Sequence, residues 1–252
     1  ICKFPRNPVA LASLQREAGL LHLLKGRLTL SVPDMVLHQG PPVFSAHPKL
    51  PGAHLLAGTY ANVSEAGKAR LAEVLGQFYA ELHAIPVAQA RLAGALPIGR
   101  WRSAADIERL ALPLLPPKIR MAAEVALADY AGMSGDQTIY GFFDGHGWNM
   151  AFDPQSEVLN GIYDFADSGI GDLHQDFVYG NFIDADLTRR TVAAYQRRTG
   201  RDLDHRRIWL LTAVLRLSEL AATVGDADGR PTMLKNAVDW LRTADEWPDA
   251  AP

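Results

Sequence analysis

Two short stretches decide the fold of this chain: Phe143-Asp144-Gly145-His146-Gly147-Trp148-Asn149, and Ile162-Tyr163-Asp164-Phe165-Ala166-Asp167. Asp144 precedes Asn149 by five residues, and Asp164 ends a short run of β-prone residues. A carboxylate can accept the proton of an attacking hydroxyl, and carboxylate and amide oxygens are the hard ligands that Mg²⁺ prefers. The pattern predicts that Asp144 acts as a general base and that Asn149 and Asp164 bind magnesium.

The five-residue spacing is that of the kinase catalytic loop, and Asp164 stands where the magnesium-binding aspartate of a kinase is expected. The stretch resembles the aminoglycoside phosphotransferase and choline kinase group, whose motif is His-Gly-Asp-x-His-x-x-Asn. Asp144, His146 and Asn149 match in place. Phe142-Phe143 replaces the His-Gly of the motif, and Trp148 replaces a residue that is usually small. The resemblance implies an α+β, protein-kinase-like fold with two lobes.

The resemblance covers roughly residues 1–200, in the order in which the family carries its motifs. It implies that Lys3 orients the nucleotide phosphates, that Glu17 pairs with Lys3, and that Ala46, His47 and Leu50 help to bind the base of ATP or GTP through main-chain groups near the lobe connection. Further similar stretches are Pro48 to Gly52, Leu82-His83, Gly171-Asp172 and Asp176-Phe177.

The implied activity is transfer of the γ-phosphate of ATP to a hydroxyl group of a small molecule. From Met121 to Thr188 the sequence has twelve carboxylates and no Lys or Arg. Such an acidic region favours a cationic acceptor, so an aminoglycoside, with an antibiotic-resistance role, or an amino alcohol is expected. An uncharged sugar, a macrolide or another metabolite with a hydroxyl group stays open.

The predicted division places a remnant of the nucleotide-binding lobe at residues 1–51 and the catalytic lobe at residues 52–252, with a hinge at 47–52, where prolines and Gly52 interrupt regular structure. The family has two strands before its lysine strand, so the chain is expected to be a fragment or a processed product. Apolar periodicity predicts helices at 9–24, 64–83 with Ser64 as N-cap, 104–112, 117–131, 184–198, 206–224 and 231–243. Strands are predicted at 1–4, 28–30, 35–38, 42–46, 138–143, 150–152 and 161–165.

Two other functions compete with this interpretation. A metal-dependent hydrolase could use Asp144, His146, Asp164 and His174 as ligands, although no pair of histidines has the short helical spacing typical of such sites. A catalytically impaired, kinase-like nucleotide-binding protein is the second. Several of these residues could instead have a purely structural role. His146 could form a hydrogen bond within its loop, and Trp148 could be a core or rim aromatic. Three aspartates could cap helices or turns, namely Asp167, Asp172 and Asp176.

Composition excludes several classes of protein. The net charge of −3 disfavours a nucleic-acid-binding protein, which would need lysines and arginines to neutralise phosphates. No apolar run approaches the roughly 18 residues of a membrane helix, so no membrane partner is expected. The single cysteine, Cys2, rules out an internal disulfide and favours a cytoplasmic location.

Overall fold

The computed structural model describes residues 1–99, 101–226, 228–244 and 247. Its contacts divide the chain into two compact units, residues 1–98 with 137–202, and residues 99–136 with 203–252. The first unit contains a small sheet, several helices and both stretches quoted above. The second unit is helical. The lobe boundary between residues 51 and 52 stays a prediction.

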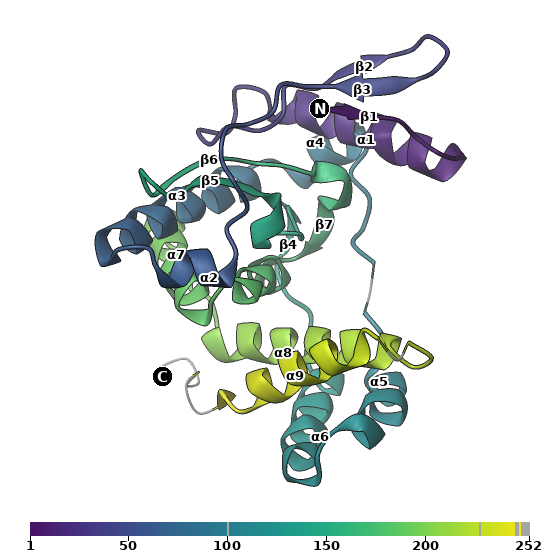
Figure 1. Cartoon of the computed structure of the whole chain (residues 1–252), viewed down its shortest axis with the longest axis vertical. Coiled ribbons are helices and arrows are strands. Elements are labelled where there is room, and N and C mark those ends of the chain that lie inside the picture. Colours follow the sequence, from purple (N-terminus) through teal and green to yellow (C-terminus); the bar gives the residue numbers. More distant parts are fainter. Residues whose placement is uncertain (100, 227, 245–246, 248–252) are drawn as a thin grey trace. The chain divides into compact units, whose positions relative to one another are not determined.

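The first unit begins with a three-stranded antiparallel sheet and one helix (Figure 1). The strand order is β1-β3-β2, which places β3 in the middle. Asn7 caps the helix by accepting a hydrogen bond from the main-chain N of Ala10 at 2.8 Å, and Pro8 occupies the first helical position, where no N–H is needed. The elements are β1 (Cys2–Lys3), α1 (Pro8–Leu24), β2 (Val36–His38) and β3 (Phe44–Ala46).

Two further antiparallel strand pairs, β4 with β7 and β5 with β6, bring the two quoted stretches together. Asp144 lies between β4 and β5, and Asp164 is the second residue after β6. The main-chain N of Tyr163 donates to the carbonyl of Asn149 at 2.8 Å, so the two stretches are in contact. The remaining elements of this unit are α2 (Ala57–Ala61), α3 (Glu65–His83), α4 (Val87–Leu92), β4 (Thr138–Gly141), β5 (Met150–Asp153), β6 (Val158–Ile162), β7 (Gly169–Asp172) and α7 (Ala185–Thr199), with short 3-10 segments that include Leu173–Phe182.

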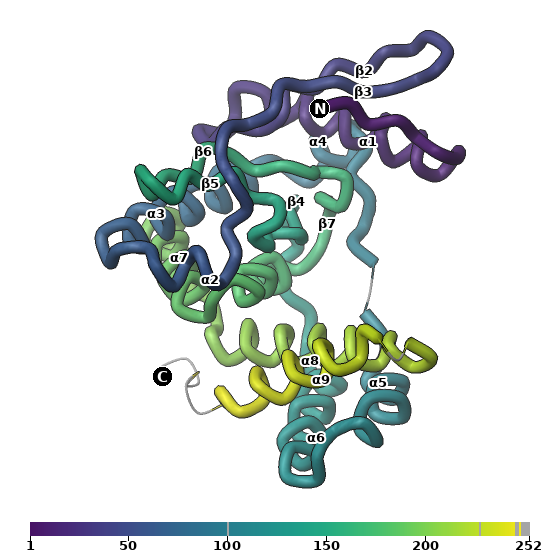
Figure 2. The backbone as a smooth tube through the Cα atoms, in the orientation of Figure 1, coloured from purple at the N-terminus to yellow at the C-terminus, as the bar shows by residue number. Residues whose placement is uncertain are grey.

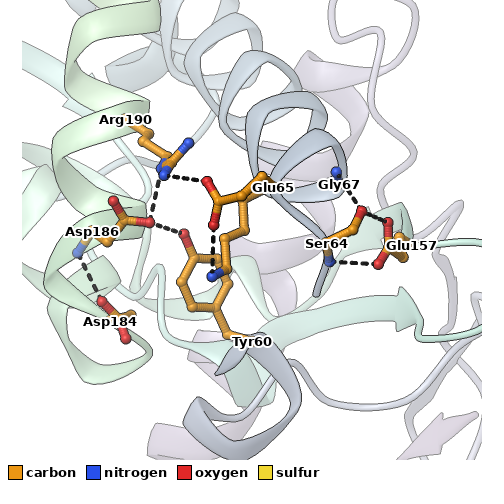
Figure 3. Close-up of polar contacts among 9 residues, drawn as sticks. Tyr60, Ser64, Glu65, Gly67, Glu157, Asp184, Asp186 and Arg190 are labelled. Carbon is orange, nitrogen blue, oxygen red and sulfur yellow. Dashed lines mark hydrogen bonds and ion pairs between the residues drawn. The ribbon is translucent and has the colours of Figure 1, made fainter. Parts of the chain in front are cut away.

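Hydrogen bonds connect the start of α3 to the turn between β5 and β6 (Figure 3). The Oγ of Ser64 accepts from the main-chain N of Gly67 at 3.0 Å, which caps the helix as predicted. Ser64 also donates to Glu157 twice, from its main-chain N at 2.7 Å and from its hydroxyl at 2.5 Å. The turn that connects β5 to β6 is therefore held by charge-assisted hydrogen bonds.

A second cluster in Figure 3 joins α2, α3 and α7. The hydroxyl of Tyr60 donates to Asp186 at 2.7 Å, and Arg190 bridges Asp186 and Glu65 at 2.8 Å each. Helices α3 and α7 pack against each other. The apolar spacing of α3 predicts a buried side made of Leu71, Val74, Leu75, Phe78 and Leu82; four of these are buried, and Val74 is only partly buried. This packed pair supports the β4–β7 and β5–β6 strands that carry the loops.

The contact between Ser64 and Glu157 predicts a pH-dependent stability. Hydrogen bonds from the Ser64 hydroxyl and main-chain N hold the pKa of Glu157 below its ordinary value of 4.5. Because the folded pKa is the lower one, this stabilisation is present above pH 4.5 and is lost as the pH falls through the folded pKa. Glu157→Gln should therefore lower the free energy of unfolding at neutral pH, and the difference from wild type should shrink as the pH falls below 4.5.

Urea unfolding over this pH range measures the difference. Glu124→Gln, an exposed position on a helix of the second unit, is the matched control and should change stability by less than about 0.5 kcal/mol. A Glu157→Gln difference that grows toward acid pH would contradict the argument.

The second unit is built around one buried helix, α8. Within this unit α8 packs against the other three helices, and the indole N–H of Trp240 donates to the carbonyl of Trp209 at 3.0 Å. The helices are α5 (Ala104–Ala111), α6 (Pro117–Ala131), α8 (His205–Ala222) and α9 (Arg230–Leu241). Over the described residues, none of the helices combines the length and apolar character needed to cross a membrane.

The predicted helices are confirmed to within one or two residues at each end, but several short elements differ. The strand predicted at 28–30 is wrong: the chain turns at Gly26, and the main-chain N of Thr29 donates to Glu81 instead of to a neighbouring strand. The strand predicted at 161–165 begins earlier and ends at Ile162. Sequence analysis missed α2, α4 and β7, which are too short for a clear apolar period.

Candidate active site

The connection from β3 to α2 lies across the β5–β6 hairpin and the loop that precedes β5 (Figure 2). Ala53 exchanges two main-chain hydrogen bonds with Phe152 at 2.8 Å, and Leu55 donates to the carbonyl of Gly147 at 3.0 Å. A Cβ at position 147 would lie 1.7 Å from the carbonyl oxygen of Leu55, so only glycine permits this approach. These main-chain hydrogen bonds therefore hold the connection against the loop that carries Asp144 and Asn149.

Both carboxylate oxygens of Asp144 are held by neighbours in its own loop. The side-chain nitrogen of Asn149 donates to Oδ2 of Asp144 at 2.7 Å and to its main-chain carbonyl at 3.0 Å. Nε2 of His146 lies 3.0 Å from Oδ1. Because the Asn149 nitrogen is used in this way, the amide oxygen is the atom left for a ligand. His146 therefore contacts the side chain of Asp144. The sequence alternative, in which His146 bonds only to the loop main chain, does not include this contact.

Asp164 has a left-handed backbone conformation, with φ of 61° and ψ of 69°. This region is unfavourable for a residue other than glycine, and such strain concentrates at functional sites. The conformation ends β6 and places the Asp164 carboxylate 3.0 Å from Nζ of Lys3, 161 residues away. Lys3 also donates to both oxygens of the buried Glu17 at 2.9 Å. Burial would lower the pKa of Lys3, but the charge and hydrogen bonds of Glu17 outweigh it and raise that pKa.

A cavity of about 450 Å³ in the first unit is bordered by Lys3, Asn149 and Asp164 together. Trp148 lies at its rim with its side chain half exposed, as a rim aromatic would. The other residues around the cavity are Ile1, His47, Lys49, Gly52, Ala53, His54, Met150 and Tyr163. A cavity of this volume is in the range of small-molecule sites.

Asp167 interacts electrostatically with Asp144 and with Asp164, which borders the cavity. Burial and the charges of Asp144 and Asp164 raise the pKa of Asp167, which is the opposite of what a helix or turn cap would do. The hydrogen bond to Asp144 raises the pKa of His146. A divalent cation would relieve this repulsion, so the amide oxygen of Asn149 and the carboxylate of Asp164 are a suitable donor set for Mg²⁺.

A buried network under the loop is the functional feature that sequence analysis missed. Asp176 is fully buried and accepts from the main-chain N of Phe142 at 2.8 Å, from the main-chain N of Phe143, and from Nε2 of His83 at 2.9 Å. Nδ1 of His83 then accepts from the hydroxyl of Tyr195 at 3.0 Å. Asp176 therefore caps neither a helix nor a turn: it holds the two residues that precede Asp144, of which Phe143 has a strained φ of 55°.

The signal for this network was present in the sequence as Leu82-His83 and as Asp176-Phe177, both noted only as similar to family motifs. Nothing in the spacing of these residues predicts that they contact each other.

The structure brings together five of the eight predicted site residues: Asp144, Asn149, Asp164, Lys3 and Glu17. His47 also borders the cavity. Ala46 lies within β3, where it pairs with Cys2 and Val36, and the carbonyl of Leu50 accepts from the hydroxyl of Tyr163 at 2.6 Å. The catalytic, metal-binding and nucleotide-binding roles of all eight stay predictions.

The metal-dependent hydrolase alternative finds no support in the described part of the chain. No group of three or more His, Cys, Asp or Glu side chains there is arranged to hold a metal ion. The proposed set of Asp144, His146, Asp164 and His174 is therefore not brought together as a ligand cluster.

The fold and a family match together define the class of protein: a phosphotransferase with a protein-kinase-like α+β fold. The sequence profile described as the phosphotransferase enzyme family matches residues 1–209, and the chain belongs to that family. No curated protein matches the sequence.

Solved structures with the same fold are aminoglycoside and macrolide phosphotransferases. The GDP complex of wild-type aminoglycoside 2'-phosphotransferase-IIIa is 23% identical with a TM-score of 0.78, and the match covers 97% of this chain and 85% of that chain. Macrolide 2'-phosphotransferase from Brachybacterium faecium is 22% identical with a TM-score of 0.65, over 94% of this chain and 83% of that chain. The ADP-bound aminoglycoside phosphotransferase APH(2'')-Ib is 20% identical with a TM-score of 0.62, and the match covers 98% of this chain and 86% of that chain.

Proposed function

We propose that this phosphotransferase uses ATP or GTP and Mg²⁺ to phosphorylate a hydroxyl group of an aminoglycoside. The observation that carries the proposal is the hydrogen bond between Asp144 and Asn149 beside a cavity that Asn149, Asp164 and Lys3 border together. A triphosphate, a divalent cation and an acceptor hydroxyl all have a chemically suitable partner in this set.

In the proposed mechanism, Lys3 binds the nucleotide phosphates and Glu17 keeps its side chain extended toward them. The amide oxygen of Asn149 and the carboxylate of Asp164 hold Mg²⁺, which when bound neutralises charge on the triphosphate. Asp144 orients the acceptor hydroxyl and accepts its proton. Because phosphoryl transfer has a loose transition state, most of the rate enhancement would come from positioning and charge neutralisation.

The purine nucleotide is supported by the GDP and ADP bound in the similar solved structures. The aminoglycoside is supported by the names of those structures and by the negative field of Asp144, Asp164 and Asp167, which attracts amino groups. A location in the cytoplasm, expected from the single cysteine, is part of the same proposal.

The acidic stretch from Met121 to Thr188 is weaker support than its composition suggests, because the fold uses many of its carboxylates. Glu157 binds the start of α3, Asp176 binds the loop main chain, and Asp136 pairs with Arg207. Asp153, Asp184 and Asp186 also make local hydrogen bonds or ion pairs.

The test is a reaction of the intact protein with Mg²⁺ and ATP or GTP against aminoglycosides, macrolides, choline-like amines and neutral sugars. Mass spectrometry should detect a phosphate ester of an aminoglycoside, absent when Mg²⁺ is chelated. If phosphate esters form only with a macrolide, the acceptor is a macrolide and not an aminoglycoside. Bound nucleotide without any ester would favour the catalytically impaired nucleotide-binding protein.

A further inference from the structure

His47 borders the same cavity as Lys3, the residue proposed to bind the nucleotide phosphates. Ile1 and Lys3 both border the cavity and are two residues apart on one extended segment, so they lie about 7 Å from each other along it. His47 pairs with Ile1, and it is 7% exposed. If phosphates bind at Lys3, the nucleotide base reaches the cavity wall formed by Ile1 and His47.

At Ala46 and His47 the main-chain groups are already paired within the sheet. His47 exchanges both of its main-chain hydrogen bonds with Ile1, at 3.0 and 2.8 Å. In an antiparallel sheet the main-chain groups of successive residues point to opposite neighbours, so those of Ala46 are used by its partner Val36 on β2. Pro48 has no N–H.

The His47 side chain supplies what the main chain does not. Its Nδ1 lies 2.8 Å from the carbonyl oxygen of Pro48. A carbonyl only accepts, so Nδ1 carries the proton, and in the neutral ring Nε2 is then an acceptor with a lone pair. Within the described residues, the hydrogen bond of the His47 ring is the one made by Nδ1. The tautomer is therefore determined by Pro48, and Nε2 is the acceptor that the ring of His47 offers at the cavity that His47 borders.

We propose that Nε2 of His47 accepts a hydrogen bond from the 6-amino group of adenine and makes the enzyme prefer ATP to GTP. The inference rests on the proposed function, since it requires the nucleotide to bind in this cavity. Guanine has an oxygen at position 6, which is also an acceptor. Nε2 and this oxygen would face each other without a hydrogen between them, which weakens binding of guanine.

The experiment compares three nucleotides by isothermal titration calorimetry with the intact protein: ATP, GTP, and purine riboside triphosphate, which lacks the 6-amino group. Wild type should bind ATP about tenfold more tightly than purine riboside triphosphate, the size expected for one neutral hydrogen bond. GTP should bind no better than purine riboside triphosphate.

Two substitutions separate the two ring nitrogens. His47→Asn keeps a donor near the position of Nδ1 for the Pro48 carbonyl and removes the acceptor, so ATP and purine riboside triphosphate should bind equally. His47→Gln places an amide oxygen near the position of Nε2, so the preference for ATP over purine riboside triphosphate should persist. Its amide can also rotate to donate, so discrimination against GTP should relax. Circular dichroism checks that both variants are folded.

Equal binding of ATP and purine riboside triphosphate by wild type would overturn the inference without any variant, and would leave the proposed function intact. A full preference for ATP in folded His47→Asn would overturn it as well. Absence of nucleotide binding by wild type would overturn both the inference and the proposed function, so the two failures are distinguishable.

Discussion

Replacing Asp144 with alanine is expected to lower the turnover number for phosphoryl transfer by roughly 10²–10⁴-fold, the range contributed by a positioned general base. Nucleotide affinity should change little, because Lys3, Asn149 and Asp164 border the cavity and Asp144 does not. Steady-state kinetics give the turnover number, and calorimetry gives the nucleotide affinity.

Asp144→Asn refines this result. Its amide oxygen can still accept from the side-chain nitrogen of Asn149, so the orientation of Asn149 is kept while the negative charge and the basicity are lost. Both variants should therefore lose turnover to a similar degree. Asp34→Ala, an exposed carboxylate on the small sheet side of the same unit, is the control and should keep full activity. Turnover equal to wild type in either Asp144 variant would contradict the assignment of Asp144 as the base.

The second large effect is expected on stability. Asp176→Ala should lower the free energy of unfolding by about 3–5 kcal/mol, because it leaves His83 and two main-chain N–H groups without their buried acceptor. The free energy of unfolding of a typical domain is only about 5–15 kcal/mol, so this loss is a large share of it. Turnover should fall too, since Asp176 holds the residues that position Asp144.

Urea unfolding followed by circular dichroism measures the loss. Asp172→Ala is the matched control: it lies four residues earlier, is only partly buried, and makes no side-chain hydrogen bond within the described residues. Its effect should stay within about 0.5 kcal/mol. An Asp176→Ala variant as stable as Asp172→Ala would show that the buried contacts are replaced by others.

The helices were predictable because their signals are local. Apolar residues at helical spacing mark α3 and α8, and Ser64 occupies the predicted cap position. Short elements such as β7, and the turn that replaced the expected strand at 28–30, have no such period. Their conformation depends on partners elsewhere in the chain, as the hydrogen bond from Thr29 to Glu81 illustrates.

The candidate site was predictable in part for a similar reason. Asp144 and Asn149 are five residues apart, so one loop brings them together, and sequence order alone places Asp164 after the next strand. Lys3 and Glu17 were identified only by resemblance to a family. Sequence reasoning also expected the main chain near residues 46–50 to bind the base, while in the structure these groups are paired at Ala46 and His47.

By itself, the sequence determined the helical segments, the kinase-like order of oxygen donors and the loop that joins Asp144 to Asn149. Only the tertiary structure decided that Lys3 contacts Asp164 and that Asp176 holds Phe142 and Phe143. The physical reason is the range of the interactions: local hydrogen bonds and apolar periodicity depend on neighbours along the chain, whereas a buried carboxylate must take whichever donors the packed core brings to it.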